Sequence, residues 1–351
     1  MADAVLHIKD GFFFEVPRAL WHPNYKSLDE VPAFLREAHP AASLDDFEHA
    51  MAGKVLIPQP FGELENLHEK ASGFCISKFM LLELLVALIL ILVFRSLARR
   101  IEGGRVPKGK FWHLLETMLL FVRDQIARPA IGGENPHNAD GAHEAEMIEH
   151  AVPAAVDAFD PNHIHEPLAM HDADAVAPGH HAREHAHHGP TGDTFVPLLW
   201  TTFFFILLCN LLGMIPWLGA PTGTFAVTLG LASVVLVTTF GSGLFTFGPK
   251  WLWHGFVPAM DLPWYMWPLK IVIFAIELLG TIIKHGVLAV RLLANMVAGH
   301  LVLLGILSMA TVVAVLGATL FSGLELFVAF LQAYIFTFLA ALFIGAAVHE
   351  H

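Results

Sequence analysis

A line of charged residues runs through the most apolar part of this chain. Its members follow one another at intervals of seven, so on an α-helix they form one slowly drifting stripe: Lys270, Glu277, Lys284 and Arg291. A charge at the centre of a bilayer costs about 2.5–3.5 kcal/mol on insertion scales, so charges kept there are expected to have a function and a partner. These residues are therefore the first candidates for chemistry.

Arg291 differs from the other members of the stripe because no acid lies within one helical turn of it. The residues three and four positions away cannot neutralise a guanidinium, which stays protonated in proteins: Val287, Leu288, Ala294 and Asn295. Few acids occur in the apolar segments, namely Glu83, Glu277 and Glu325. The counter-ion of Arg291 is expected on another helix or on another protein.

Glu277 lies one heptad from Lys270 and from Lys284, a separation that we expect to be too long for a direct helical pair. Two interpretations of Glu277 and Lys284 stay open, a hydrated access path and structural pairing. For Lys270 we favour anchoring at the membrane interface.

Composition places the chain in a membrane. Of 351 residues, 55% are hydrophobic and 15% charged, and the mean hydropathy is +0.59. The net charge of -12 comes from acids concentrated in residues 1–76 and 134–193, so it describes tails and not a recognition surface. The two cysteines, Cys75 and Cys209, predict neither a disulfide framework nor a zinc site.

The hydrophobic pattern predicts an all-α integral membrane protein with five membrane-crossing helices and one amphipathic surface helix. The crossings are expected at about 79–94, 195–218, 225–247, 263–308 and 311–348. The second and third form a hairpin, because Gly and Pro separate them. The last two exceed the ~20 residues that a perpendicular helix needs, so they either break or lie steeply inclined, and we expect the inclined arrangement.

A cluster of cations follows the first crossing and predicts its cytoplasmic end: Arg95, Arg99, Arg100, Arg105, Lys108 and Lys110. The N-terminal region, 1–76, is then outside, with little independent core. Residues 77–130 hold the first crossing and the amphipathic helix of the inner surface. Residues 131–193, with eleven histidines, are expected to be a disordered cytoplasmic insert. Residues 194–351 form the main membrane domain, whose C-terminus is cytoplasmic.

Three segments resemble one known family. RLLANMVAGH at 291–300, ELFVAFLQAYIF at 325–336 and NLLGMIP at 210–216 are similar to motifs of the a subunit of F-type ATP synthases, in the same order and spacing. The resemblance covers 194–351 well and about 61–130 loosely. It implies a proton-translocating stator of the bacterial inner membrane, with the N-terminus periplasmic, two aqueous half-channels, and an arginine facing the carboxylates of a rotating ring.

By this resemblance Arg291 is the ring-facing arginine and Gln332 lies opposite it on the last helix. The implied partners are the c-subunit ring, the b-subunit peripheral stalk, the remaining subunits of the complex and the lipid bilayer. No nucleic acid, cofactor or metal is implied. The chain contains no Gly-x-x-x-x-Gly-Lys-Ser/Thr run, so ATP chemistry is expected on other subunits and this chain is not itself an enzyme.

His300 lies nine residues after Arg291, which is half a turn around a helix and ~13 Å along it, so it is expected to line a separate path. Glu325 could meet His300 if the last two helices pack antiparallel, and a histidine beside a carboxylate is suited to proton relay. This pair favours H+ over Na+ as the coupled ion. Asn295 and Gln332 are kept as site residues, although interhelical hydrogen bonding, worth ~0.6 kcal/mol, also explains them. His285 and Glu83 are interpreted as structural.

Two other classes remain as alternatives. Histidines of the insert, such as His180, His181 and His185, suggest a metal transporter, but the crossings carry no acid and histidine pair at helical ligand spacing. A non-catalytic membrane scaffold is the second alternative, and it predicts that Arg291 is paired inside this chain.

Overall fold

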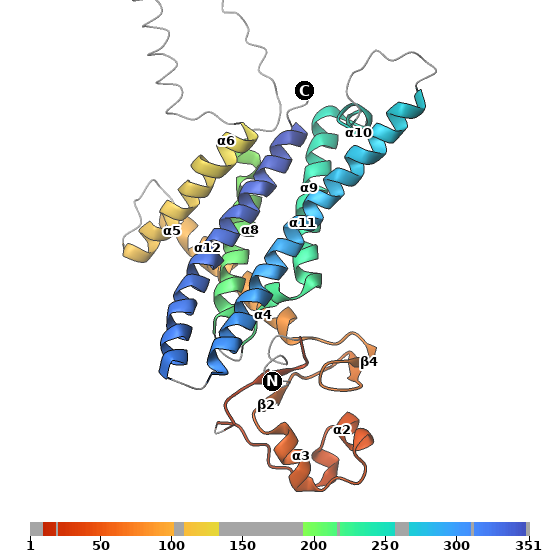
Figure 1. Cartoon of the computed structure of the whole chain (residues 1–351), viewed down its shortest axis with the longest axis vertical. Helices are drawn as coiled ribbons and strands as arrows, with labels where there is room; N and C mark the ends of the chain where they lie inside the picture. The colour runs from red at the N-terminus through yellow and green to blue at the C-terminus, as the bar shows by residue number, and fades with distance from the viewer. Residues whose placement is uncertain are drawn as a thin grey trace, which may run out of the picture.

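Five long apolar helices make up the body of the molecule (Figure 1). The computed structural model describes residues 10–18, 20–101, 109–132, 192–215, 218–256, 267–309 and 312–348. Five of the helices are long and apolar enough to cross a membrane, as predicted: α4 (Lys78–Ile101), α8 (Gly192–Gly213), α9 (Phe225–Phe247), α11 (Trp267–Leu307) and α12 (Val312–Val348).

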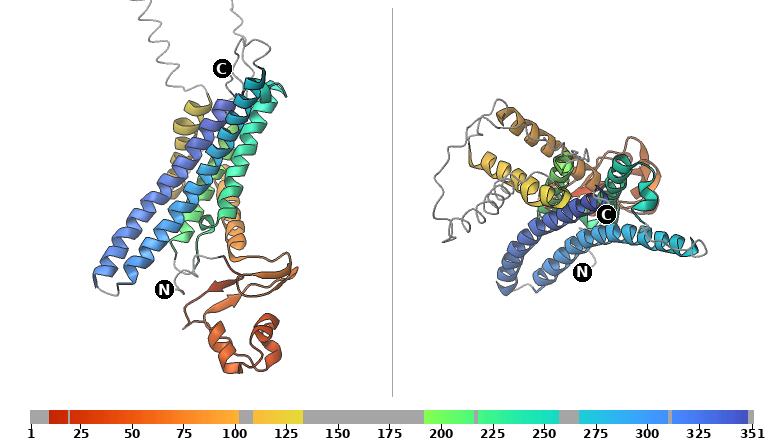
Figure 2. Two further views of the ribbon diagram at one scale, coloured as in Figure 1. Left: turned by 45° about the vertical axis from the view of Figure 1, so that its right-hand side comes forward. Right: turned by 90° about the horizontal axis from the view of Figure 1, so that it is seen from above.

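The last two helices are unbroken. Helix α11 has 41 residues and α12 has 37, so at 1.5 Å per residue they measure ~60 and ~55 Å. They run antiparallel, and the two views of Figure 2 show both as neighbouring curved helices that lie obliquely to α8 and α9. The alternative in which each block breaks into two elements is therefore wrong.

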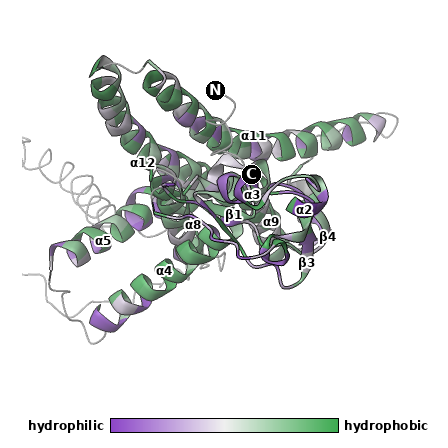
Figure 3. Ribbon diagram, turned by 90° about the horizontal axis from the view of Figure 1, so that it is seen from below, coloured by the Kyte–Doolittle hydropathy of each residue, from purple (hydrophilic) through white to green (hydrophobic). Residues whose placement is uncertain are grey.

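Helix α8 is the internal helix of the bundle. Half of its most apolar window, 50%, is buried, against 22% in α4 and in α11. It contacts both α4 and α12, and the shared core contains Val86, Leu199, Ile206 and Phe336. The outward faces of α4, α11 and α12 are apolar (Figure 3), so they are suited to lipid or to a partner.

A tight connection joins α8 to α9 and confirms the predicted hairpin. It contains the short turn η3 (Pro221–Gly223), whose buried Thr222 hydroxyl donates to Asn210 Oδ1 at 2.8 Å. Gly213 has no room for a side chain, because a Cβ there would collide with Met296 and Ala220. The end of α8 therefore lies against α11.

The segment after α4 is one continuous helical stretch formed by α5 (Lys110–Phe121), the π-helical η2 (Val122–Ala127) and α6 (Arg128–Ile131). It buries Val122, Ile126 and Ile131 against α8 and α12. Its position at the inner membrane surface stays a prediction.

The N-terminal region folds into two small sheets and short helices. Strand β1 (Phe13–Glu15) pairs antiparallel with β2 (Lys54–Leu56), and β3 (Gly62–Leu64) pairs with β4 (Lys70–Gly73). The single turn η1 (Leu28–Glu30) and helices α2 (Ala33–Ala38) and α3 (Leu44–Met51) complete it. Val31, Phe47 and Met51 are buried there. Their elements are too short to show a sustained period in the sequence.

The N-terminal region lies at one end of the helix bundle and the end of α12 lies at the other (Figure 2). Short α10 (Trp251–His254) precedes α11 at the end where α12 finishes. Of the histidine-rich insert, residues 133–191 lie outside the described residues, as do Arg105 and Lys108 of the cationic cluster. The two edges of the insert meet, because Gly192 N donates to Gly132 O at 2.7 Å.

Candidate functional site

Arg291 faces outward from α11. Its helical neighbours Leu288 and Leu292 are buried in the core, whereas Arg291 and Val290 are exposed. Within the described part of the chain, Arg291 makes no hydrogen bond or ion pair with another side chain. The scaffold alternative requires such a pair, so the geometry disfavours it.

His300 and Glu325 come together from α11 and α12, as antiparallel packing predicted. His300 Nδ1 lies 3.7 Å from Glu325 Oε1, and both side chains are largely buried. The same ring faces two carbonyl oxygens, with Nδ1 3.0 Å from Met296 O and Nε2 3.0 Å from Gly213 O. A carbonyl only accepts, so both contacts are hydrogen bonds only when the ring carries both protons. The site can therefore hold a proton beside a carboxylate.

The Glu325 carboxylate lies close to α11 but makes no direct hydrogen bond to His300. Its distance to His300 exceeds that of a hydrogen bond, and Oε1 has no hydrogen-bond partner among the described residues. Gly299 leaves room for the carboxylate, because a Cβ at that position would lie 2.8 Å from Oε1. A larger residue at this point of α11 would displace the flexible end of the Glu325 side chain.

A cavity of about 190 Å³ adjoins this pair, and we refer to it as the Glu325 cavity. Its polar lining comes from Asn210 of α8, Asn295 of α11 and Glu325 of α12. Asn210 Nδ2 is buried and without a partner in the described structure. The sequence reasoning missed Asn210 as a lining residue, although an amide in an apolar crossing was the signal available.

A second cavity, of about 150 Å³, lies toward the start of α11, and we refer to it as the Glu277 cavity. Glu277, Thr281, Lys284 and His285 line it together with residues of α9, α10 and α12. Glu277 Oε1 lies 3.8 Å from Lys284 Nζ, so the expectation that one heptad is too long for a direct pair is wrong. Two extended side chains bridge the turn that lies between their backbones.

Packed apolar residues separate the two cavities. Leu288 and Leu292 of α11 and Phe336 of α12 are at most 1% exposed and belong to the same core cluster. Gln332 is also buried on α12, and its Nε2 has no partner in the described part. No hydrogen bond joins Gln332 to Arg291 among the described residues, so their opposition stays an expectation. Along α11, Arg291 falls between the residues of one cavity and those of the other.

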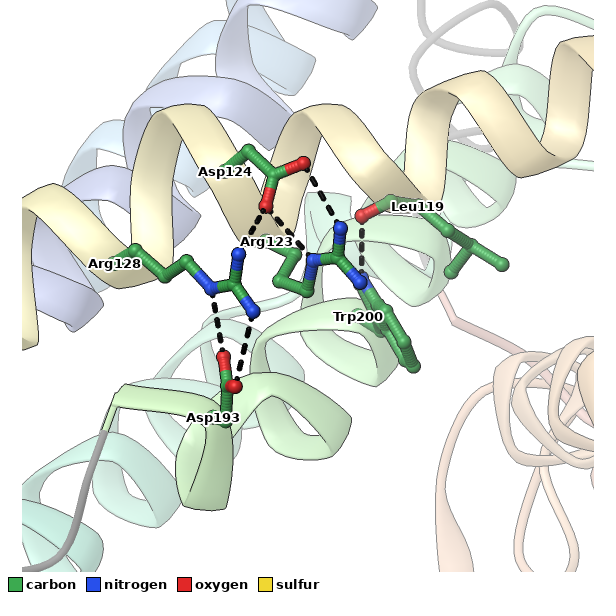
Figure 4. A network of polar contacts seen from close by, with 6 residues as sticks. All are labelled: Leu119, Arg123, Asp124, Arg128, Asp193 and Trp200. Carbon is green, nitrogen blue, oxygen red and sulfur yellow. Dashed lines mark hydrogen bonds and ion pairs between the residues drawn. The ribbon is translucent and has the colours of Figure 1, made fainter. Parts of the chain in front are cut away.

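A network of ion pairs joins η2 and α6 to the start of α8, and a hydrogen bond to α5 lies beside it (Figure 4). Arg128 contacts Asp124 at 3.1 Å and holds Asp193 through two hydrogen bonds, at 3.0 and 3.1 Å. Arg123 also pairs with Asp124, and its hydrogen bond keeps the pKa of that carboxyl below the ordinary value. Trp200 Nε1 donates to Leu119 O at 2.8 Å beside them. Sequence reasoning missed the network, because 65 positions separate Arg128 from Asp193.

Among the described residues, no group of three or more histidines, cysteines and acids is placed to hold a metal ion. The histidines of the insert lie outside that part, so the metal-transporter alternative rests on them alone.

Comparison with known proteins identifies the family of this chain. A family model described as ATP synthase A chain matches residues 180–345. ATP synthase subunit a of Myxococcus xanthus is 32% identical over 82% of this chain and 79% of its own length. ATP synthase subunit a 2 of Chlorobaculum tepidum is 30% identical, over 85% and 71%. ATP synthase subunit a of Chlorobium phaeobacteroides reaches 43% over 46% of this chain and 49% of its own length. The chain therefore belongs to the ATP synthase subunit a family, the proton-translocating stator subunits of F-type ATP synthases.

Proposed function

We propose that protons pass this chain through two half-channels that do not meet inside it, and that Arg291 controls the gap between them. One observation carries the proposal. Two cavities, each with polar side chains in a partly apolar wall, lie at different levels of α11. Packed apolar side chains separate them, and an exposed arginine without a partner in the described chain lies between them. A proton entering one cavity must leave the chain to reach the other.

The missing carrier is a carboxylate of the rotating c-subunit ring. When a protonated ring carboxyl approaches Arg291, the guanidinium lowers its pKa, so the proton leaves through one half-channel. The carboxylate moves past Arg291 and is reprotonated from the other half-channel. His300 and Glu325 relay protons beside the Glu325 cavity, with Asn295 in its wall. Glu277 and Lys284 form the mouth of the other path, and Gln332 supports the surface that the ring meets.

The outward face of α11 supports contact with the ring. Ile283, Val287 and Val290 are about half-exposed around Arg291 and give an apolar surface on which a helix of the ring can slide. The c-subunit ring, the b-subunit peripheral stalk and the remaining subunits are the proposed partners, together with the lipid bilayer. The chain itself is non-catalytic, and ATP is made on other subunits.

The proposed orientation is that of a bacterial inner-membrane protein with a periplasmic N-terminus and a cytoplasmic C-terminus. Arg95, Arg99 and Arg100 at the end of α4 support it, because cations favour the cytoplasmic side. In this orientation the Glu325 cavity serves the periplasmic side and the Glu277 cavity serves the cytoplasmic side.

The test is ATP-driven proton pumping in inverted vesicles that carry the complete complex with Arg291→Ala. We expect loss of pumping, with passive proton leak through the membrane sector kept or increased. Arg99→Ala, at an exposed cation outside the proposed path, is the matched control and should pump normally. Normal pumping by assembled Arg291→Ala complexes would contradict the proposal.

A further inference from the structure

The Glu277 cavity contains a buried histidine that the mechanism above does not use. His285 is 3% exposed, although it directly follows the half-exposed Lys284 in the chain. Its ring lies 4.6 Å from the ring of Phe343 on α12, centroid to centroid. The volume of about 150 Å³ is enough for several waters next to it.

The hydrogen bonding of His285 fixes which nitrogen can take up a proton. Nδ1 lies 2.8 Å from Thr281 O, one turn earlier on α11. A carbonyl oxygen accepts only, so Nδ1 carries the hydrogen of this bond and Nε2 of the neutral ring keeps its lone pair. Nε2 is buried and has no hydrogen-bond partner among the described residues. Buried polar atoms are normally satisfied, so Nε2 lacks the partner that a water entering from the cavity would supply when the surrounding side chains move slightly.

His285 lies between Glu277 and Arg291 along α11. Glu277 lies 14 residues before Arg291, which is ~21 Å along a helix, and His285 lies six residues before it, which is ~9 Å. Glu277 and Lys284 are half-exposed where the cavity opens, whereas His285 lies deeper. Among the described lining residues, Glu277 and Lys284 are the only other charged groups, since α9, α10 and α12 contribute Thr239, Trp251, Phe343 and other uncharged side chains.

We propose that His285 is the proton carrier between the Glu277 cavity and the ring carboxylate at Arg291. In one direction Nε2 binds a proton from a cavity water, which Glu277 and Lys284 keep supplied from the bulk, and the imidazolium then returns that proton through water to the ring. In the other direction the same steps run backwards, so no group is consumed. The inference rests on the proposed function, because it needs a ring carboxylate as donor and acceptor.

The opposing explanation is that His285 only packs between Thr281 and Phe343. The two explanations differ in the effect of His285→Asn, whose side-chain amide can still donate to Thr281 O but cannot take up a proton. A packing residue would change the amount of assembled complex and leave the pH dependence of each complex unchanged. A proton carrier would change the pH dependence.

The experiment uses the complete complex in inverted vesicles, where the bath contacts the proposed cytoplasmic side. For His285→Asn we expect ATP-driven pumping per assembled complex to fall severalfold, and to fall more steeply than in wild type as the bath pH rises from about 5 to 8. Imidazole added to the bath should restore part of the rate in His285→Ala. A wild-type rate and pH profile in assembled His285→Asn complexes, with no response of His285→Ala to imidazole, would overturn the inference.

Two further measurements separate the possible failures. Arg291→Ala is measured in parallel: if it still pumps, the proposed function fails, whereas loss of pumping there with normal His285→Asn overturns only the role of His285. If the His285 variants do not assemble, Thr281→Cys tests the cavity with His285 in place. We expect a water-soluble thiol reagent in the bath to modify it, with the buried native Cys75 and Cys209 as background. Protection of Thr281→Cys would show a dry cavity and overturn the inference.

Discussion

Two arginines of this chain lie in opposite electrostatic situations. Arg128 contacts two carboxylates, Asp124 and Asp193, and closes the junction between α6 and α8 (Figure 4). Arg291 has no acid within a helical turn and no ion pair among the described residues. The sequence shows that Arg291 has no nearby acid, whereas the pairing of Arg128 with Asp193 appears only in the structure. Arg128 holds two parts of this chain together, and Arg291 is left for a partner.

Two of the three acids in the apolar helices lie beside other basic side chains. Glu277 pairs with Lys284 at 3.8 Å, and Glu325 lies 3.7 Å from His300. A guanidinium in a low-dielectric membrane interacts strongly with any carboxylate that reaches it. An unpaired guanidinium can therefore bind a carboxylate that a partner brings to it. An arginine paired like Arg128 could not serve in this way.

The largest expected effect comes from giving Arg291 a partner of its own. Val287 is exposed one turn before Arg291, and a glutamate four residues before an arginine is the favourable order for a helical ion pair. We expect Val287→Glu to reduce proton-driven ATP synthesis to the level of Arg291→Ala, because the new carboxylate competes with the ring. ATP synthesis by energised vesicles, normalised to the amount of assembled complex, measures this.

Val287→Gln is the matched control for that substitution. It has the same size and polarity without the charge, so we expect most of the ATP synthesis to remain. Equal ATP synthesis by Val287→Glu and Val287→Gln would show that Arg291 does not need to be unpaired within this chain in order to function.

A smaller effect is expected at the paired arginine. The hydrogen bond from Arg123, and then the charges of Arg123 and Arg128, lower the pKa of Asp124 in the folded protein. A lowered pKa means that the carboxylate stabilises the fold above its ordinary pKa of about 4, and that this contribution is lost as the pH falls through the folded value. We expect Asp124→Asn to lower the melting temperature of the purified complex at pH 7. The loss in the free energy of unfolding should not exceed ~1 kcal/mol, because the carboxylate is partly exposed.

The sign of the pH dependence distinguishes this network from a general loss of packing. The gap in melting temperature between wild type and Asp124→Asn should stay constant from pH 7 to about 5 and narrow as the pH falls below about 4 toward the lowered pKa of Asp124, because Asp124 then becomes neutral in the wild type too. Asp45→Asn, at an exposed acid of the N-terminal region, is the control and should show little change. A gap that is constant with pH would contradict the electrostatic explanation, with coupling of the complex unchanged in either case.

The sequence predicted those features that depend on residues close together in the chain. Helical periodicity acts over a few turns, so it predicts the five crossings, and the absence of an acid near Arg291 is readable from four positions on either side. The meeting of His300 with Glu325 needed only two helices in antiparallel order. These features depend on near neighbours or on a single packing assumption.

The features that were missed depend on contacts that periodicity does not encode. Arg128 and Asp193 are brought together by the packing of α6 on α8, and Asn210 faces a cavity only because α11 and α12 pass beside α8. The burial of His285 next to an exposed lysine is set by α12, which places Phe343 against it. The Glu277 and Lys284 contact depends on side-chain extension, which backbone spacing alone underestimates.

The smallest expected effect concerns the histidine-rich insert. Its edges are already joined, by Gly192 N to Gly132 O at 2.7 Å and by the Arg128 pair with Asp193. A short Gly-Ser linker in place of residues 133–191 therefore only has to connect two ends that already touch. A shorter loop also costs slightly less entropy to close. We expect assembly and ATP-driven pumping to match wild type. Loss of pumping in the shortened chain, together with loss of pumping by the wild type when a metal chelator is added, would instead give the histidines a function. The same deletion combined with Asp193→Asn should assemble less well than either change alone, because the linker then lacks the ion pair that holds its two ends.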